Sequence, residues 1–568
     1  MFENEISRRR LLVALGSAGA LAGLPSCAYW QTGNVCSPDL RTGDPNKPLT
    51  IDMHAHVFNA SDVHVNRLLT DVIGRDSEFK GAIDLLSGPI QSLLWTHTPD
   101  YNKEMRGVAR LKEAFDSCQP GSALSDGGVK SVTDALRRER YDDTVQELRN
   151  ANARQARTLR TGQAADIARL LDDLPDADTY FERGPRLRAL RARGRDVKVD
   201  GVLAFIICQG QYRCLNWLEY VRAIGSSPKR DVDLAVAHLL DFDWPLGGGS
   251  PTATSVQDQI KLMSQITILS RGRIHGFAPF CPMRAVMHRG PFSPLEMAQD
   301  AVHKKGFIGI KIYPPMGFAP CGNGKIHRQK PDFWQRAWLP ASLRAVPDFG
   351  DQLDGRLAEL YRWCEDFEVP IMTHTIQSMG TCDDFEELAT ARHWKEAITL
   401  FPRLRVNFGH FGDPLQDRKP PYTKPYIDLM RKAGQRGENL YADSGYFSEV
   451  LSRPKELSRK LAELQNYSLA VGSAPLYDRL MFGTDWNMAS LIGQKVRSYL
   501  SSFETVLQGL DPSAGDRFFG SNAATFLGLR QNGKNRQRLD QFYSLNGIPT
   551  PLWMRKIDKP QASPRAIS

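Results

Sequence analysis

The stretch Leu49-Thr-Ile-Asp-Met-His-Ala-His-Val-Phe58 is a short apolar run that carries two histidines, His54 and His56. Side chains alternate between the two faces of a β-strand, so the two histidines of an H-x-H triplet point to the same face. Both imidazoles can therefore bind one metal ion. Such a triplet also occurs by chance, and a histidine on a half-buried strand is often only hydrogen-bonded, so the rest of the chain decides its meaning.

Strand-like apolar runs recur along the chain and alternate with amphipathic segments, a pattern that predicts parallel strands with crossover helices. They are residues 50–58, 201–208, 232–240, 274–280, 307–313, 369–375, 404–410, 439–443 and 479–485. Closure at eight repeats predicts a TIM (β/α)8 barrel, so we expect one of the two earliest runs to lie outside it.

The domain organisation follows from these runs. Residues 49–58 and 200–530 form the barrel, and 59–199 form a large, mainly helical insertion after the first strand. A Pro-rich C-terminal extension covers residues 531–568. The insertion is rich in arginine, which could bind an anion or a membrane surface; we favour a solvent-exposed helix face paired with Asp and Glu.

Polar residues end several of the predicted strands, and these are the candidate site residues. They are His54, His56, Lys311, His374, His410 and Asp485. Each has a structural alternative, because a histidine can be a core residue, an aspartate a helix cap, and a lysine can reach solvent. The carboxyl ends of barrel strands meet at one mouth, so we expect at least four of them to converge.

Imidazoles and a carboxylate are the ligands that zinc prefers, and an open coordination position makes such a site catalytic. The ion lowers the pKa of a bound water toward neutrality. Asp485 can then contact the metal or its water and transfer a proton to a leaving group, while His410 can polarise a carbonyl or relay a proton.

At these residues the sequence resembles the amidohydrolase superfamily, specifically its amidohydrolase-related branch, which includes aminocarboxymuconate-semialdehyde decarboxylase. The resemblance lies in the H-x-H triplet, the later histidines and Leu480-Met-Phe-Gly-Thr-Asp-Trp486. The segments Gly306-Phe-Ile-Gly-Ile-Lys-Ile-Tyr-Pro314 and Gly520-Ser-Asn-Ala-Ala-Thr-Phe-Leu-Gly-Leu529 are also similar to the branch.

The resemblance implies a ligand set for the metal. His54, His56, His374 and Asp485 would bind the ion, and His410 would assist catalysis. Lys311 would be a ligand only if the centre is binuclear and the lysine carboxylated. We favour one ion, zinc or another divalent metal, with two as the alternative.

These inferences predict a metal-dependent hydrolase that uses metal-activated water on a C–N or C–O bond of a small molecule. The alternative on the same barrel is a non-oxidative decarboxylase or hydratase, which needs an acid substrate and a cation such as Arg284 to bind it. The alternative from another class is a non-catalytic envelope binding protein.

Composition limits the other classes of partner. The 568 residues carry 73 Lys and Arg against 64 Asp and Glu, mostly interspersed, for a net charge of +9. No nucleic-acid-binding motif accompanies this charge, so we expect no nucleic-acid partner. The oligomeric state is not predicted. Nine cysteines, none in a C-x-x-C motif, disfavour a thiolate zinc site, and Cys208/Cys214 and Cys364/Cys382 are near enough in sequence to pair as disulfides.

The N-terminus predicts a location. Ser7-Arg-Arg-Arg-Leu-Leu12 precedes a short apolar run and Pro25-Ser-Cys27, which resembles a twin-arginine export signal over residues 1–27. Cys27 also resembles a lipoprotein acceptor, which would anchor the protein to a membrane. We therefore expect a periplasmic or envelope-anchored protein.

Replacing Arg8 and Arg9 together by lysine is expected to leave the protein in the cytoplasm, because the signal is recognised through its arginine pair. Cell fractionation with immunoblotting measures this, and Arg41→Lys serves as the control. Normal export of the double variant would contradict the twin-arginine route.

Overall fold

The structure is a computed structural model. It describes residues 43–73, 98–117, 128–155, 168–169, 171–183, 190–192, 195–197, 205–376, 379–415, 422–432, 434–510 and 514–559. The predicted export signal, with Cys27, lies outside the described residues.

Eight parallel strands form one sheet in the order β1-β4-β5-β6-β7-β8-β9-β10. The strands are β1 (Ile51–Ala55), β4 (Leu234–His238), β5 (Ile274–Pro279), β6 (Gly309–Ile312), β7 (Ile371–His374), β8 (Val406–Gly409), β9 (Leu440–Asp443) and β10 (Leu480–Met481). The first and last strands also meet, since the Met53 amide donates to the Phe482 carbonyl at 2.8 Å and the Thr484 amide to the His54 carbonyl at 3.2 Å. The fold is the predicted TIM (β/α)8 barrel.

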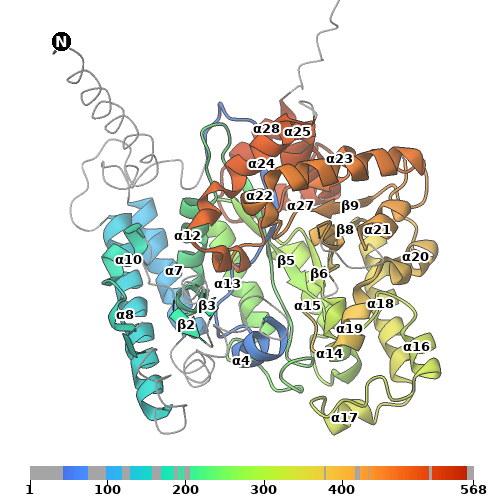
Figure 1. Ribbon diagram of the computed structural model, residues 1–568, viewed down its shortest axis with the longest axis horizontal. Coiled ribbons are helices and arrows are strands. Elements are labelled where there is room, and N and C mark those ends of the chain that lie inside the picture. Colours follow the sequence, from blue (N-terminus) through green and yellow to red (C-terminus); the bar gives the residue numbers. More distant parts are fainter. Residues whose placement is uncertain are drawn as a thin grey trace, which may run out of the picture.

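Helices connect and surround the strands (Figure 1). The longer ones are α12 (Arg213–Ala223), α13 (Val256–Leu269), α15 (Pro294–Lys304), α18 (Phe349–Asp366), α20 (Ala391–Leu400), α23 (Pro454–Ala470) and α24 (Tyr499–Gln508). Shorter helices are α14 (Pro282–Met287), α16 (Asn323–Gln329), α17 (Ala341–Arg344), α19 (Asp383–Glu386), α21 (Thr423–Leu429), α22 (Glu449–Ser452), α25 (Ala514–Asp516) and α26 (Asn522–Phe526). No helix of the described residues is long and apolar enough to cross a membrane.

As expected, one of the two earliest runs lies outside the barrel: it is residues 201–208, whose described residues 205–208 are not a strand. Residues 205–209 are helical, and the other eight predicted runs contain the barrel strands. A short run of apolar residues does not distinguish a buried strand from a buried helical turn, because both are apolar on every side. Here Phe205, Ile206 and Ile207 are all buried.

The helices α7 (Tyr101–Asp116), α8 (Val129–Gln155) and α10 (Ala177–Arg183), which follow β1 in the chain, lie together on the left of Figure 1. The short helix α4 (Val65–Arg67) lies nearer the centre of that view, and a small hairpin joins β2 (Leu190–Ala192) to β3 (Arg195–Val197). Arginines of α8 form ion pairs with carboxylates, as expected: Arg137 with Glu219, and Arg138 with Asp178. Only part of this face is exposed to solvent, because Arg138 is exposed but Arg137 is buried.

A buried hydrophobic cluster, here called the mouth cluster, joins these helices to the barrel. The loops after β1, β4, β6 and β10 contribute Phe58, Phe242, Met316 and Leu491. The helical side contributes Tyr141, Val145, Leu148, Tyr180, Phe181, Phe205, Ile206 and Ile207. The helices therefore pack against the carboxyl-terminal ends of the barrel strands.

The last two helices, α27 (Lys534–Leu545) and α28 (Leu552–Asp558), cover the opposite end of the barrel. Lys556 Nζ forms a 2.6 Å ion pair with Asp233 at the start of β4, and Trp553 donates to the Gly272 carbonyl at 2.9 Å. The described part of the C-terminal extension is thus part of the barrel core.

The expected disulfides are absent from the described residues. Cys208, Cys214 and Cys364 are free thiols, as are Cys281 and Cys321. Cys208 instead donates to Asn216 Oδ1 at 3.1 Å, and Cys214 and Cys364 are buried among apolar side chains. Closeness in sequence therefore did not predict disulfide bonds, because the side chains that surround each thiol fix its position separately.

A buried ionic cluster fastens the loop after β1 to α7 and α12. The Arg213 guanidinium bonds to both Asp62 and Glu104, and the Asn59 side chain donates to Glu104 at 2.6 Å. Two carboxylates share one guanidinium here, and burial raises the pKa of Glu104 from 4.5 to about 7. The cluster therefore fixes the loop that follows the H-x-H triplet.

The raised pKa of Glu104 predicts how stability depends on pH. The folded protein keeps a proton on this carboxyl between about pH 4.5 and 7 that the unfolded chain releases, so the free energy of unfolding falls as pH rises through this window. One group contributes up to about 1.4 kcal/mol per pH unit. Denaturant unfolding from pH 5 to 7 should show the wild type losing stability relative to Glu104→Gln. Glu113→Gln, on the exposed face of α7, should follow the wild type. If the difference in free energy of unfolding between the wild type and Glu104→Gln does not change with pH, the raised pKa of Glu104 would be contradicted.

Candidate metal centre

Three predicted site residues form a compact group at the mouth of the barrel. His54, His56 and Asp485 are the group of possible metal-binding side chains that the described residues contain. Asp485 Oδ1 lies 3.3 Å from His56 Nε2 and 3.5 Å from His54 Nε2. All three side chains are buried.

The spacing and chemistry of these atoms fit a divalent ion. Ligands about 2.0–2.1 Å from zinc at tetrahedral angles lie about 3.3–3.4 Å from one another. The Nε2 atoms of His54 and His374 are also buried without a hydrogen-bond partner in the described part of the chain. A buried imidazole nitrogen without a partner is costly, and a metal ion would satisfy it.

Hydrogen bonds fix the tautomers of His54 and His56. His54 Nδ1 donates to Asp443 Oδ1 at 3.0 Å, and His56 Nδ1 donates to the His238 carbonyl at 2.9 Å. In each ring the proton is on Nδ1, so the Nε2 lone pair faces the compact group. Such partners orient metal-binding histidines and increase their basicity.

A third chain of hydrogen bonds orients His374 in the same way. His410 Nδ1 donates to the Gly445 carbonyl at 2.9 Å, which leaves His410 Nε2 as an acceptor. His374 Nδ1 donates to it at 3.1 Å, so the His374 Nε2 lone pair is free. His374 lies outside the compact group of three, and its ring stacks on Tyr313 with centroids 4.3 Å apart.

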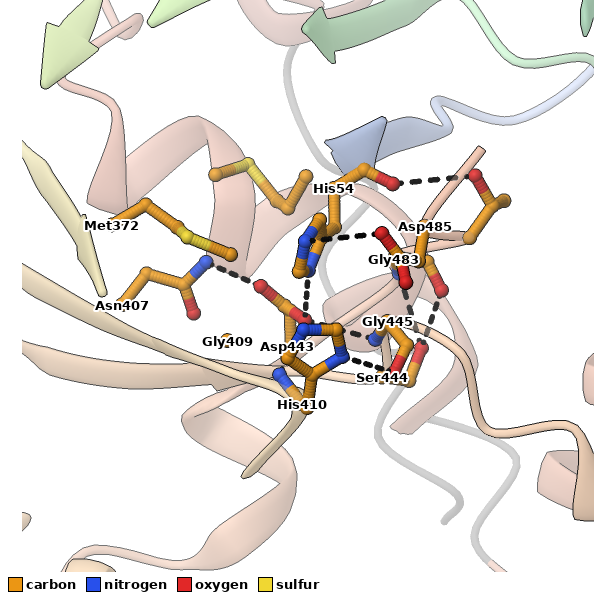
Figure 2. Close-up of polar contacts among 12 residues, drawn as sticks. His54, Met372, Asn407, Gly409, His410, Asp443, Ser444, Gly445, Gly483 and Asp485 are labelled. Carbon is orange, nitrogen blue, oxygen red and sulfur yellow. Dashed lines mark hydrogen bonds and ion pairs between the residues drawn. The ribbon is translucent and has the colours of Figure 1, made fainter. Parts of the chain in front are cut away.

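Three glycines make room for the His54 ring (Figure 2). A Cβ atom on Gly445 would lie 2.3 Å from His54 Nδ1, and one on Gly483 would lie 2.9 Å from His54 Cβ. One on Gly409 would lie 3.3 Å from His54 Cε1. A side chain at Gly445 or Gly483 would therefore displace His54, while one at Gly409 would first displace Met372, whose Cε would lie 2.2 Å from the added Cβ.

Burial sets the protonation of the histidines. It lowers the pKa of His54 and His374 well below the usual value, and that of His410 is also lowered. The imidazoles are therefore neutral at neutral pH, as metal binding requires.

Lys311 is buried at the end of β6 but does not join the compact group. Its Nζ donates to Met372 Sδ at 2.6 Å and lies 5.2 Å from the centre of the Tyr313 ring. Burial lowers its pKa to about 7, against the attraction of Asp443 and Asp485. These contacts do not arrange Lys311 as a bridge between two ions.

Arg284, predicted as a cation for an acid substrate, is already paired. It forms a two-pronged ion pair with Asp241, at 2.6 and 2.7 Å, and also bonds to Asp243. The prediction is therefore not supported, because the loop after β4 supplies carboxylates that the sequence pattern did not place beside it.

Two supporting residues were missed from sequence. Asp443 ends β9 and accepts hydrogen bonds from His54, Asn407 and two backbone amides. His238 ends β4, with its ring 5.2 Å from that of His54. Asp443 also ends the predicted run 439–443, which was the available signal, whereas His238 lies inside the predicted run 232–240.

Part of the chain matches a known protein family. The family model described as amidohydrolase matches residues 285–529. This part of the barrel is therefore similar to the amidohydrolase family. The match covers the strands that carry Lys311, His374, His410 and Asp485, and β1 supplies the H-x-H triplet from outside it. No curated protein matches the chain in sequence.

Solved structures similar to this chain include an uncharacterised TIM-barrel protein from Bordetella bronchiseptica, with 15% identity, a TM-score of 0.31, and coverage of 52% of this chain and 77% of that one. A probable 2-pyrone-4,6-dicarboxylic acid hydrolase from Acinetobacter baumannii, with citric acid bound, has 12% identity, a TM-score of 0.29 and coverage of 60% and 92%. A dihydroxybenzoic acid decarboxylase from Polaromonas sp. JS666, with bound manganese and 2-nitroresorcinol, has 14% identity, a TM-score of 0.33 and coverage of 56% and 91%.

The glycine positions predict how the site can be disrupted without removing a ligand. Gly445→Ala is expected to displace His54 and weaken binding of a divalent metal by about 10- to 100-fold, because its Cβ would occupy the space of the Asp443–His54 hydrogen bond. Competition with a chelator measures the affinity. Gly355→Ala is the matched control, since nothing lies within 4 Å of its Cβ. Unchanged affinity in Gly445→Ala would contradict the role of this hydrogen bond.

Proposed function

We propose that this barrel is a metal-dependent hydrolase that acts on a C–N or C–O bond of a small molecule. The observation that carries the proposal is the convergence of His54 Nε2, His56 Nε2 and Asp485 Oδ1 at 3.3 and 3.5 Å, with the histidine tautomers fixed by buried partners. The match of residues 285–529 to the amidohydrolase family model supports it.

His54, His56 and Asp485 would hold the ion, with His374 as the fourth candidate. We propose zinc, because two or three imidazoles and one carboxylate are its preferred ligands. When bound, such an ion polarises a carbonyl group and lowers the pKa of a water molecule.

Asp485 is the proposed proton carrier. Its carboxylate can accept a proton from the attacking water and deliver it to the leaving nitrogen or oxygen, since it is buried at the mouth beside His56. His410 is proposed as a positioning residue rather than a base, because both of its ring nitrogens are already bonded, to Gly445 and His374.

A decarboxylase is the second candidate, and one observation favours it. An acid substrate needs a cation near the metal centre, and buried Lys311 provides one where the paired Arg284 does not. Turnover of candidate acids, followed both as carbon dioxide release and as hydrolysis product, distinguishes the two reactions. His410→Asn should lower the rate of either reaction, because it alters the hydrogen bond that orients His374.

Metal analysis tests the proposed function. The purified protein is expected to contain about one divalent ion per chain, and His54→Ala to contain much less, because it removes a ligand and its fixed tautomer. Elemental mass spectrometry of the dialysed protein measures the number of metal ions per chain. His303→Ala is the control, since this histidine lies on α15, outside the site. A wild type without stoichiometric metal, or a His54→Ala variant with full occupancy, would refute the proposal.

A further inference from the structure

Asn407, on β8, is a buried polar side chain inside the barrel. Its neighbour Phe408 points outward, because its ring packs against Trp394 of α20 and Tyr426 of α21 with centroids 5.9 and 4.7 Å apart. Side chains alternate along a strand, so Asn407 points into the barrel. The buried cluster there is apolar and includes Met53, Val236, Phe277, Met372 and Met481. An amide in such an interior costs free energy unless its polar atoms are bonded.

Only one end of this amide is bonded. Asn407 Nδ2 donates to Asp443 Oδ2 at 2.6 Å (Figure 2), whereas Asn407 Oδ1 is buried without a partner in the described part of the chain. The reverse orientation would place the amide oxygen against a carboxylate oxygen, so the amide cannot be turned round. By contrast, Asn535 bonds through both ends, donating to the Ile308 carbonyl at 2.8 Å and accepting from Arg538 at 3.2 Å. The hydrogen bond to Asp443 is therefore what the Asn407 side chain contributes.

This hydrogen bond completes the set of donors around Asp443. Asp443 Oδ1 accepts from His54 Nδ1 at 3.0 Å and from the backbone amides of His410 and Gly445 at 3.1 and 2.9 Å. Oδ2 accepts from Asn407, and no other donor among the described residues reaches it. The torsion of a carboxylate about its last carbon–carbon bond is soft, so hydrogen bonds must fix it. Asn407 fixes the oxygen that the other three donors do not hold.

We propose that Asn407 is a positioning residue of the metal centre, which acts through Asp443 on His54. By holding Oδ2, it keeps a lone pair of Oδ1 directed at His54 Nδ1, and that hydrogen bond directs His54 Nε2 toward Asp485. Without Asn407, Oδ2 would be a buried anionic oxygen with no partner, which favours rotation of the carboxylate. Outer hydrogen bonds of this kind orient metal ligands and increase the affinity for the ion. The inference rests on the proposed function, since it requires that His54 binds an ion.

Asn407→Leu tests the inference, because leucine has the same branched shape and donates no hydrogen bond. We expect this variant to bind cobalt(II) about 10-fold more weakly than the wild type, measured by competition with a chelator. The visible absorption spectrum of the cobalt-loaded variant should change as well, because the geometry of the ligands changes. Asn407→Val should show the same loss, and replaces Asn407→Leu if that variant does not fold. Asn535→Leu, another buried asparagine but at the opposite end of the barrel, is the control and should bind cobalt(II) as the wild type does.

A second substitution distinguishes positioning from general support of the fold. Asp443→Asn removes the carboxylate on which Asn407 acts. If Asn407 acts through Asp443, adding Asn407→Leu to Asp443→Asn should change the cobalt(II) affinity by no more than about two-fold. If Asn407 only supports the fold, the two losses should add.

The outcomes separate this inference from the proposed function. A folded Asn407→Leu with the cobalt(II) affinity or the spectrum of the wild type would overturn the inference, as would losses that add in the double variant. A wild type that binds no divalent ion would instead refute the proposed function, whatever the variants do.

Discussion

The hydrogen bond between His54 Nδ1 and Asp443, 3.0 Å long and wholly buried, is the interaction on which the site depends. In the sheet, β10 lies between β1 and β9, so the His54 ring must cross the last strand to reach Asp443. Gly483 on that crossing cannot carry a side chain, because a Cβ would lie 2.9 Å from His54 Cβ. The absence of a side chain at Gly483 therefore leaves the space in which the His54 side chain is buried.

The same region closes the barrel. β10 is only two residues long, and the chain beyond it hydrogen-bonds to β1. Asp52, two residues before His54, accepts from Thr484 Oγ1 at 2.6 Å and Tyr220 at 2.8 Å, and burial raises its pKa to about 7. The contacts that close the barrel between β1 and the segment after β10 therefore also place His54 beside Asp485. This is why the site needs both Asp52 and Thr484, which are far apart in the sequence.

Much of this architecture was readable from sequence because it is periodic. Eight apolar runs gave the strands, and the polar residues that end them gave His54, His56 and Asp485. The helical turn at Phe205 was mistaken for a strand, because a short buried run has no distinguishing period. Asp443 was overlooked because a single aspartate after a strand has many possible roles. The ion pair between Arg284 and Asp241 and the absence of the expected disulfides depend on contacts between residues that are distant in sequence. The spacing of residues along the chain does not reveal such contacts.

The metal centre and a small pocket lined by Lys311, Phe242 and Met316 use different parts of the barrel. The compact group comes from β1 and the segments that follow β1 and β10, whereas the pocket is built by the loops after β4, β5 and β6. Phe242 and Met316 belong both to that pocket and to the mouth cluster, which includes Tyr141 and Val145 of α8. Since packed side chains have few alternative arrangements, α8 supports these two pocket residues through the mouth cluster. The candidate metal ligands thus come from the barrel itself, while helices that follow the first strand pack against the loops that line the neighbouring pocket.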